Sequence, residues 1–202
     1  MSMQSTTLLV ARTDLLLQSH FIDAASGKAR IYNMLALTGG TRIAFYAFFA
    51  SHIVFTLICD LQAVLKPFYP QLLQDLVTNY AIFVKDPHMS EPFELWFQSI
   101  VFTEAIFQLP FFFVAVHFFG DSHRKTYPRW FQMLSIVYGS HTATTLIPIL
   151  PVILLRDEEE APLQWRLLCF FIYLPYFTFP AWLAWIAVND DSDLVLASKR
   201  NE

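Results

Sequence analysis

The chain has 202 residues, of which 55% are hydrophobic, 17% aromatic and only 15% charged, and its mean hydropathy is +0.44. A soluble core of this size could not bury that much apolar surface, which excludes an ordinary soluble domain and indicates a single membrane domain. The net charge is −4 and no basic block is dense enough for nucleic acid, so that class of partner is also excluded.

The first 40 residues are of mixed polarity, and their apolar stretch LLLQSHFI is too short for a secretory signal. We therefore predict three parts. Residues 1–40 form an N-terminal cytosolic leader, residues 41–188 form a four-helix transmembrane domain, and residues 189–202 form a cytosolic tail.

Four apolar segments are long enough to cross about 30 Å of hydrocarbon as helices, at residues 41–65, 96–119, 130–155 and 163–188. Proline interrupts three of them, and a proline kink leaves room between helices. The sequence thus predicts an all-α membrane bundle of kinked helices with an internal pocket between them. The prolines concerned are Pro110, Pro148, Pro151, Pro175 and Pro180.

Lysine and arginine are distributed unevenly on the two sides of these spans. The leader, the loop after the second span and the tail hold nine of them, against four on the other side. Because basic residues favour the cytosol, we expect both termini to be cytosolic. Between the first two spans, the stretch YPQLLQDLVTNYAIFV has the spacing of an amphipathic helix that lies at the membrane interface.

Asp60 and Glu104 are the acidic residues that stand out inside the apolar runs, where ionisable side chains usually face a bundle interior or a wet cavity. Asp60 ends the stretch HIVFTLICD, so it is either solvated just beyond the span or an anion that lines a pocket; the pattern favours the pocket. Glu104 lies in mid-run and is either functional or a structural hydrogen-bonding carboxyl. Gln108 follows one helical turn later on the same face.

Other polar residues have simpler explanations. His141 and its neighbouring threonines in YGSHTATTL suit helix packing, His52 could be a core histidine, and Asp86 in KDP suits a turn. Cys59 and Cys169 lie in apolar runs and fit small apolar side chains. No metal-ligand spacing, P-loop or nucleophile motif is present, so neither a metal nor a cofactor is expected, and no catalytic residue is assigned.

Four stretches, SHIVFTLICDLQAVL, the KDP turn, WFQSIVFTEAIFQLPFF and IVYGSHTATTLIPIL, together resemble the sigma-2 receptors of the EXPERA domain family. The resemblance covers about residues 45–185 in order. It implies a four-helix membrane bundle of the endoplasmic reticulum, with nuclear or endolysosomal membranes as further locations. It also implies a homodimer and a membrane-facing internal pocket that binds sterols, oxysterols and cationic amphiphilic amines. The family's animal members are tied to cholesterol homeostasis and to a lysosomal cholesterol transporter, which is an expected partner.

The resemblance also assigns roles to residues. It implies that Asp60 pairs with the ligand amine, that Asp86 supports it through a hydrogen-bonded network, and that Glu104 and Gln108 line the pocket. Further pocket positions are implied for His52, Tyr138, Thr145 and Tyr176. These assignments agree with the charge argument for Asp60, since a desolvated carboxylate and a buried amine offset each other's burial. The ending KRNE loosely resembles a dibasic retrieval signal, in agreement with a cytosolic tail.

Two other functions remain possible on the sequence. The EXPERA family also contains Δ8–Δ7 sterol isomerases, which need an acid and a base, and two carboxyl groups could supply them. The isomerases carry a histidine one helical turn before a glutamate, however, whereas His141 here has Thr145 at that position. A non-enzymatic partner that stabilises another membrane protein is the third alternative.

Overall fold

Residues 33–190 are described by the computed structural model. Outside the described residues lie residues 1–32 of the predicted leader and residues 191–202 of the predicted tail, with its basic pair Lys199 and Arg200. Within the described part, four helical segments are long and apolar enough to cross a membrane: Gly39–Phe68, Leu95–Gly120, Arg129–Leu154 and Leu163–Val188. Their ends differ from the predicted ones by at most three residues, and the prediction of an all-α membrane bundle is confirmed.

The first two spans are each divided by a π-helical turn. The first consists of α2 (Gly39–Phe55), the π turn η1 (Thr56–Asp60), α3 (Gln62–Leu65) and the 3₁₀ turn η2 (Lys66–Phe68). The second consists of α5 (Leu95–Thr103), the π turn η3 (Glu104–Gln108) and α6 (Leu109–Gly120). The other two spans are single helices, α7 (Arg129–Leu154) and α8 (Leu163–Val188).

Proline accounts for one of the two π turns. Pro110 lies in the first turn of α6 and has no N–H to donate to the carbonyl one turn earlier, where η3 widens the helix. No proline lies within η1 or next to it. The remaining prolines are inside α7 and α8, which continue through them as helices.

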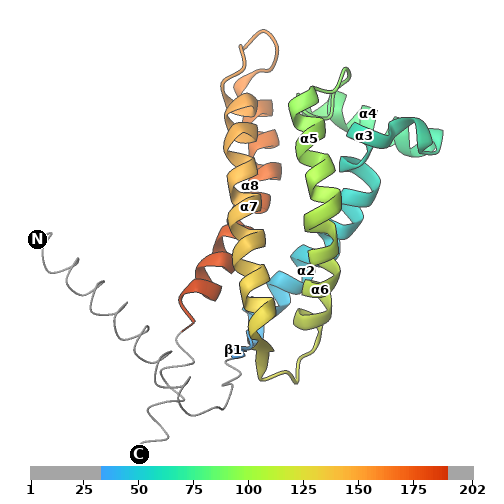
Figure 1. Ribbon diagram of the computed structural model, residues 1–202. Coiled ribbons are helices and arrows are strands. Elements are labelled where there is room, and N and C mark those ends of the chain that lie inside the picture. The colour runs from blue at the N-terminus through green and yellow to red at the C-terminus, as the bar shows by residue number, and fades with distance from the viewer. Residues whose placement is uncertain (1–32, 191–202) are drawn as a thin grey trace, which may run out of the picture. The chain divides into compact units, whose positions relative to one another are not determined.

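The four spans associate as two pairs. α7 packs along α8, and α2 packs along α6 (Figure 1). Between the first and second spans lies α4 (Gln71–Val84), which contacts α8. It buries Val77, Ala81 and Val84 and exposes Leu72 and Phe83, so the predicted amphipathic helix is confirmed as a helix with two faces.

Two apolar clusters hold the pairs together. One is aromatic: Phe45 and Phe49 of α2 and Phe112 and Phe119 of α6 have no exposed surface. The other joins α4, α5, α7 and α8. Much of the chain's phenylalanine thus packs between helices, where each aromatic side chain buries a large apolar area.

A short strand pair joins the aromatic cluster. β1 (Asn33–Leu35) pairs antiparallel with β2 (Thr126–Pro128), so that Met34 is opposite Tyr127, and both side chains are buried. Residues 33–38, which the predicted boundary placed in the leader, therefore pack against the loop between the second and third spans.

Candidate ligand-binding cavity

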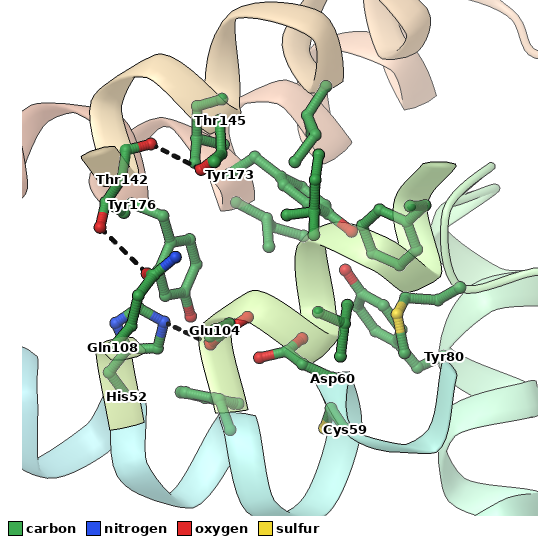
Figure 2. Close-up of a pocket in the computed structure, with 18 residues that line it drawn as sticks. His52, Cys59, Asp60, Tyr80, Glu104, Gln108, Thr142, Thr145, Tyr173 and Tyr176 are labelled. Atoms are coloured by element: carbon green, nitrogen blue, oxygen red, sulfur yellow. Dashed lines mark hydrogen bonds and ion pairs between the residues drawn. The ribbon is translucent and has the colours of Figure 1, made fainter. Parts of the chain in front are cut away.

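A mostly apolar cavity lies between the helix pairs, at the level of the two π turns (Figure 2). Its walls come from all four spans and from α4. The apolar part is made by phenylalanine, isoleucine, leucine, valine and methionine side chains. The polar and tyrosine part consists of His52, Cys59, Asp60, Tyr80, Glu104, Gln108, Thr142, Thr145, Tyr173 and Tyr176.

The π turns carry the two carboxyl groups. Asp60 is the last residue of η1 and Glu104 is the first residue of η3. A π turn adds a residue to the helical repeat and so redirects the side chains that follow it, and such turns are common at functional sites. Both acids thereby face one cavity, as Figure 2 shows, although they belong to different spans.

Glu104 is held by side chains of the first span. The Thr56 hydroxyl donates to Oε1 of Glu104 at 2.6 Å, and Nε2 of His52 lies 3.5 Å from the same oxygen. The His52 ring stacks on Phe112 and is buried. These contacts orient the Glu104 carboxyl toward Asp60 rather than toward lipid.

A second set of polar contacts joins η3 to α7. Gln108 is buried, and its Oε1 accepts a hydrogen bond from the Thr142 hydroxyl at 3.0 Å. The Thr145 hydroxyl donates to the backbone oxygen of Thr142 at 2.8 Å. The three side chains thus form a polar strip along one wall of the cavity.

Asp86 lies behind the wall and not in it. It is fully buried, and its Oδ2 accepts hydrogen bonds from the hydroxyls of Tyr80 at 3.1 Å and Tyr173 at 2.9 Å. Its Oδ1 accepts from the backbone N–H groups of His88 at 2.9 Å and Met89 at 3.3 Å. Because Tyr80, Tyr173 and Met89 all line the cavity, Asp86 fixes its end wall.

The turn that contains Asp86 is itself anchored to the third span. Lys85 ends α4 in the left-handed conformation with φ 56°, and its carbonyl accepts a hydrogen bond from the Arg156 guanidinium. His88 is buried with Nε2 3.2 Å from the Ile149 carbonyl, and burial lowers its pKa. Burial and the nearby Asp86 raise the pKa of Tyr80, so its hydroxyl keeps the proton that it donates.

Comparison with known proteins decides the family. The model of EXPERA, the expanded EBP superfamily, matches residues 72–187, more than half of the chain. The chain belongs to the EXPERA family. It is 44% identical to Sigma intracellular receptor 2 of Xenopus tropicalis over 146 residues, which is 69% of this chain and 82% of that protein. It is 41% identical to Sigma intracellular receptor 2 of Homo sapiens over 143 residues, which is 66% of this chain and 78% of that protein.

Most residues that the EXPERA resemblance assigned to a pocket meet at this cavity. Six of them line it: His52, Asp60, Glu104, Gln108, Thr145 and Tyr176. Asp86 supports it from behind. Tyr138 is not among the residues that line it: it lies one turn before Thr142 along α7, at the level of the aromatic cluster, into which it packs. Its ring stacks on Phe111, with ring centroids 4.4 Å apart.

Several cavity residues of this EXPERA protein were not predicted. Tyr173 has a local pattern that fits an apolar span, and Tyr80 and Thr142 were attributed to an interfacial helix and to helix packing. Thr56, which holds Glu104 from outside the lining, was not predicted either. One signal was available for Tyr173, which is three residues before the predicted Tyr176 and so lies near it on the same helix face. The pairing of Tyr173 with Asp86 joins residues 87 apart in sequence, which no local pattern can indicate.

Proposed function

We propose that this EXPERA protein is a non-enzymatic intramembrane receptor that binds sterols, oxysterols or cationic amphiphilic amines and takes part in sterol homeostasis or trafficking. One observation carries the proposal. Asp60 and Glu104 face a mostly apolar cavity, and both belong to apolar membrane spans.

The charge of the cavity favours a cationic ligand. No lysine or arginine of the described residues lines it, so the protein supplies no permanent cation there beside the two acids. A carboxylate removed from water is costly unless a cation compensates it. A ligand amine supplies that charge, and the rings of Tyr173 and Tyr176 can cover the amine from the side.

The size of the cavity favours an amphiphile. It encloses about 190 Å³, below the range of roughly 300–1,000 Å³ that is usual for drug-sized ligands. We therefore expect it to hold the polar end of the ligand, while the apolar remainder extends outward. Phe55 belongs to the wall and is 49% exposed on a membrane span, which fits an opening toward lipid. A sterol would place its hydroxyl at the carboxyl groups in the same way.

An isomerase remains the competing function, because the EXPERA family includes isomerases and because His52, Asp60 and Glu104 meet within 4.8 Å. Two carboxyls and an imidazole could act as acid and base. The relatives that match most of this chain are named receptors, which supports the non-enzymatic alternative. Incubation of the purified protein with a Δ8 sterol separates the two, since only the enzyme forms the Δ7 product.

The test of the receptor is saturation binding of radiolabelled ditolylguanidine, a cationic amphiphile, to the protein purified in detergent. We expect saturable binding by the wild type and its loss in Asp60→Asn, with weaker binding in Glu104→Gln. Asp75→Asn is the matched control, because Asp75 is an exposed acid of α4 outside the cavity. Unlabelled sterols should displace the label.

Two outcomes would contradict the proposal. Binding that survives in Asp60→Asn would place the cation elsewhere, and absence of binding by folded wild type would leave the partner-protein function.

We further propose residence in the endoplasmic reticulum membrane with cytosolic termini, a homodimer, and association with a lysosomal cholesterol transporter.

A further inference from the structure

We propose that His52, Asp60 and Glu104 form a binding site for one divalent metal ion of the Zn²⁺ type. Each residue offers one ligand atom, and these atoms all lie within 4.8 Å of one another. The residues come from α2, η1 and η3, so the site joins the first span to the second. All three line the cavity, which leaves a further coordination position open to water or to a ligand.

The donor set fits this class of ion. One imidazole nitrogen and two carboxylate oxygens are donors that Zn²⁺ accepts, and three protein ligands with one open position are typical of its open sites. Ligand atoms at about 2.0–2.2 Å from a tetrahedral ion are roughly 3.3–3.6 Å apart. Nε2 of His52 and Oε1 of Glu104 already have this separation at 3.5 Å, and a pair at the outer limit of 4.8 Å must close by about 1 Å, which rotation of the Asp60 carboxyl group can supply.

Charge balance distinguishes a divalent from a monovalent cation here. Two carboxylates and one dication form a neutral unit, which an apolar cavity without lysine or arginine tolerates. A singly charged amine compensates only one of the two carboxylates.

The state of His52 is the second, independent observation. The side chain is buried, and Nδ1 has no hydrogen-bond partner among the described residues. Nε2 lies 3.5 Å from Oε1 of Glu104, which is at the outer limit for a hydrogen bond (Figure 2). A buried imidazole with neither nitrogen well bonded is costly, and a metal ion on Nε2, the nitrogen nearest Glu104, would give that nitrogen a strong partner, while Nδ1 stays without one among the described residues.

The metal and the amine should exclude each other, because both need the Asp60 carboxylate. This competition rests on the proposed function, whereas metal binding does not. The metal would thus regulate access of amphiphiles to the cavity.

The experiment is a titration of the purified, tag-free and metal-free full chain with Co²⁺, whose visible absorption reports its coordination, followed by displacement with Zn²⁺. We expect one ion per chain. His52→Phe keeps the aromatic packing and removes the nitrogen, and Glu104→Gln keeps the shape; each should weaken binding by at least about tenfold. His117→Gln is the control, since this exposed histidine of α6 lies outside the cavity and should change nothing.

Unchanged Co²⁺ binding in both His52→Phe and Glu104→Gln, or absence of binding by the wild type, would overturn the proposal. Glu104→Gln decides the question if His52→Phe does not fold, as judged by its thermal unfolding. In a parallel arm, Zn²⁺ should displace radiolabelled ditolylguanidine. Metal binding without displacement would confirm the metal site and contradict the shared amine site, so the two failures are distinguishable.

Discussion

At the scale of single residues, the acids inside the fold have different surroundings and different tasks. Asp86 accepts four hydrogen bonds and is not among the described residues that line the cavity, which fits a structural carboxylate. Glu104 accepts one short hydrogen bond and faces the cavity together with Asp60. Asp86 therefore positions the residues of the cavity wall, whereas Glu104 and Asp60 are expected to contact the ligand.

Asp86→Asn should destabilise the fold by about 1–3 kcal/mol, because an amide cannot accept hydrogen bonds at both of its ends and leaves buried donors unpaired. Tyr80 and Tyr173 would lose their common acceptor, so ligand affinity should fall as well. Unfolding in detergent and radioligand binding measure the two effects. Asp121→Asn, at a partly exposed acid that pairs with Arg124, should change stability by less than about 1 kcal/mol. Equal effects of the two variants would contradict the assignment.

His88 should make stability depend on pH. Burial lowers the pKa of the folded His88 below its ordinary value of 6.5, although the nearby Asp86 opposes the shift. Above that value both folded and unfolded His88 are neutral, and the stability is fully present. As the pH falls below it, the unfolded state takes up the proton first, so stability is lost until the lower folded pKa is reached.

We therefore expect the unfolding temperature to fall between about pH 7.5 and 5.5, with a smaller fall in His88→Gln. His123→Gln, at an exposed histidine of the loop before β2, should keep the slope of the wild type. If His88→Gln also keeps the wild-type pH dependence of the unfolding temperature, then burial of His88 does not cause that dependence.

At the scale of elements, the α7–α8 pair depends on a close approach at Gly139. A Cβ built there would lie 2.3 Å from the Pro180 carbonyl oxygen and 2.7 Å from the Ala184 Cβ. Small residues at such positions let membrane helices pack closely. The approach brings Thr142 and Tyr176 to the same cavity.

Gly139→Ala should destabilise the protein by about 1–3 kcal/mol, because the added methyl group forces the two helices apart. Gly40→Ala is the control, since a Cβ at Gly40 meets nothing within 4 Å, and its effect should be under about 1 kcal/mol. Unfolding in detergent compares them. A harmless Gly139→Ala would mean that α7 and α8 are not packed so closely.

The elements also show how far the sequence predicts this molecule. Hydropathy and length predicted the spans to within three residues, because a membrane demands long apolar helices whatever their packing. The π turns were not predicted, since Thr56–Asp60 has the composition of an ordinary helix. β1 escaped prediction because three residues give too short a pattern. Most site residues were predicted from the resemblance and not from a local pattern. Tyr138, which the resemblance also assigned to the pocket, is not among the residues that line the cavity.

At the scale of the whole molecule, the two ends of the spans carry different loops, and which end faces the cytosol stays a prediction. Arg42 at the start of α2 donates to the Phe119 carbonyl at the end of α6, and the β1–β2 pair lies at the same end of these helices. The loop between α7 and α8, with its acidic run Asp157–Glu160, lies at the other end of α7. We expect the first end to face the cytosol.

Topology can be measured by introducing single cysteines at Lys125 and at Glu159, in a background without Cys59 and Cys169. An impermeant maleimide applied to plasma-membrane-permeabilised cells with intact internal membranes should label the first position only. Labelling at position 159 alone would show the opposite orientation and contradict the prediction.

The central claim is that the cavity at the π turns holds the ligand. The most direct measurement is photolabelling of the purified protein with a photoreactive cationic amphiphile, followed by mapping of the adducts by mass spectrometry. We expect adducts on cavity residues of different spans, such as Phe55, Ile100 and Tyr176. An excess of unlabelled amphiphile should prevent these adducts. Adducts confined to exposed side chains outside the cavity, such as Phe113 and Trp185, would contradict it.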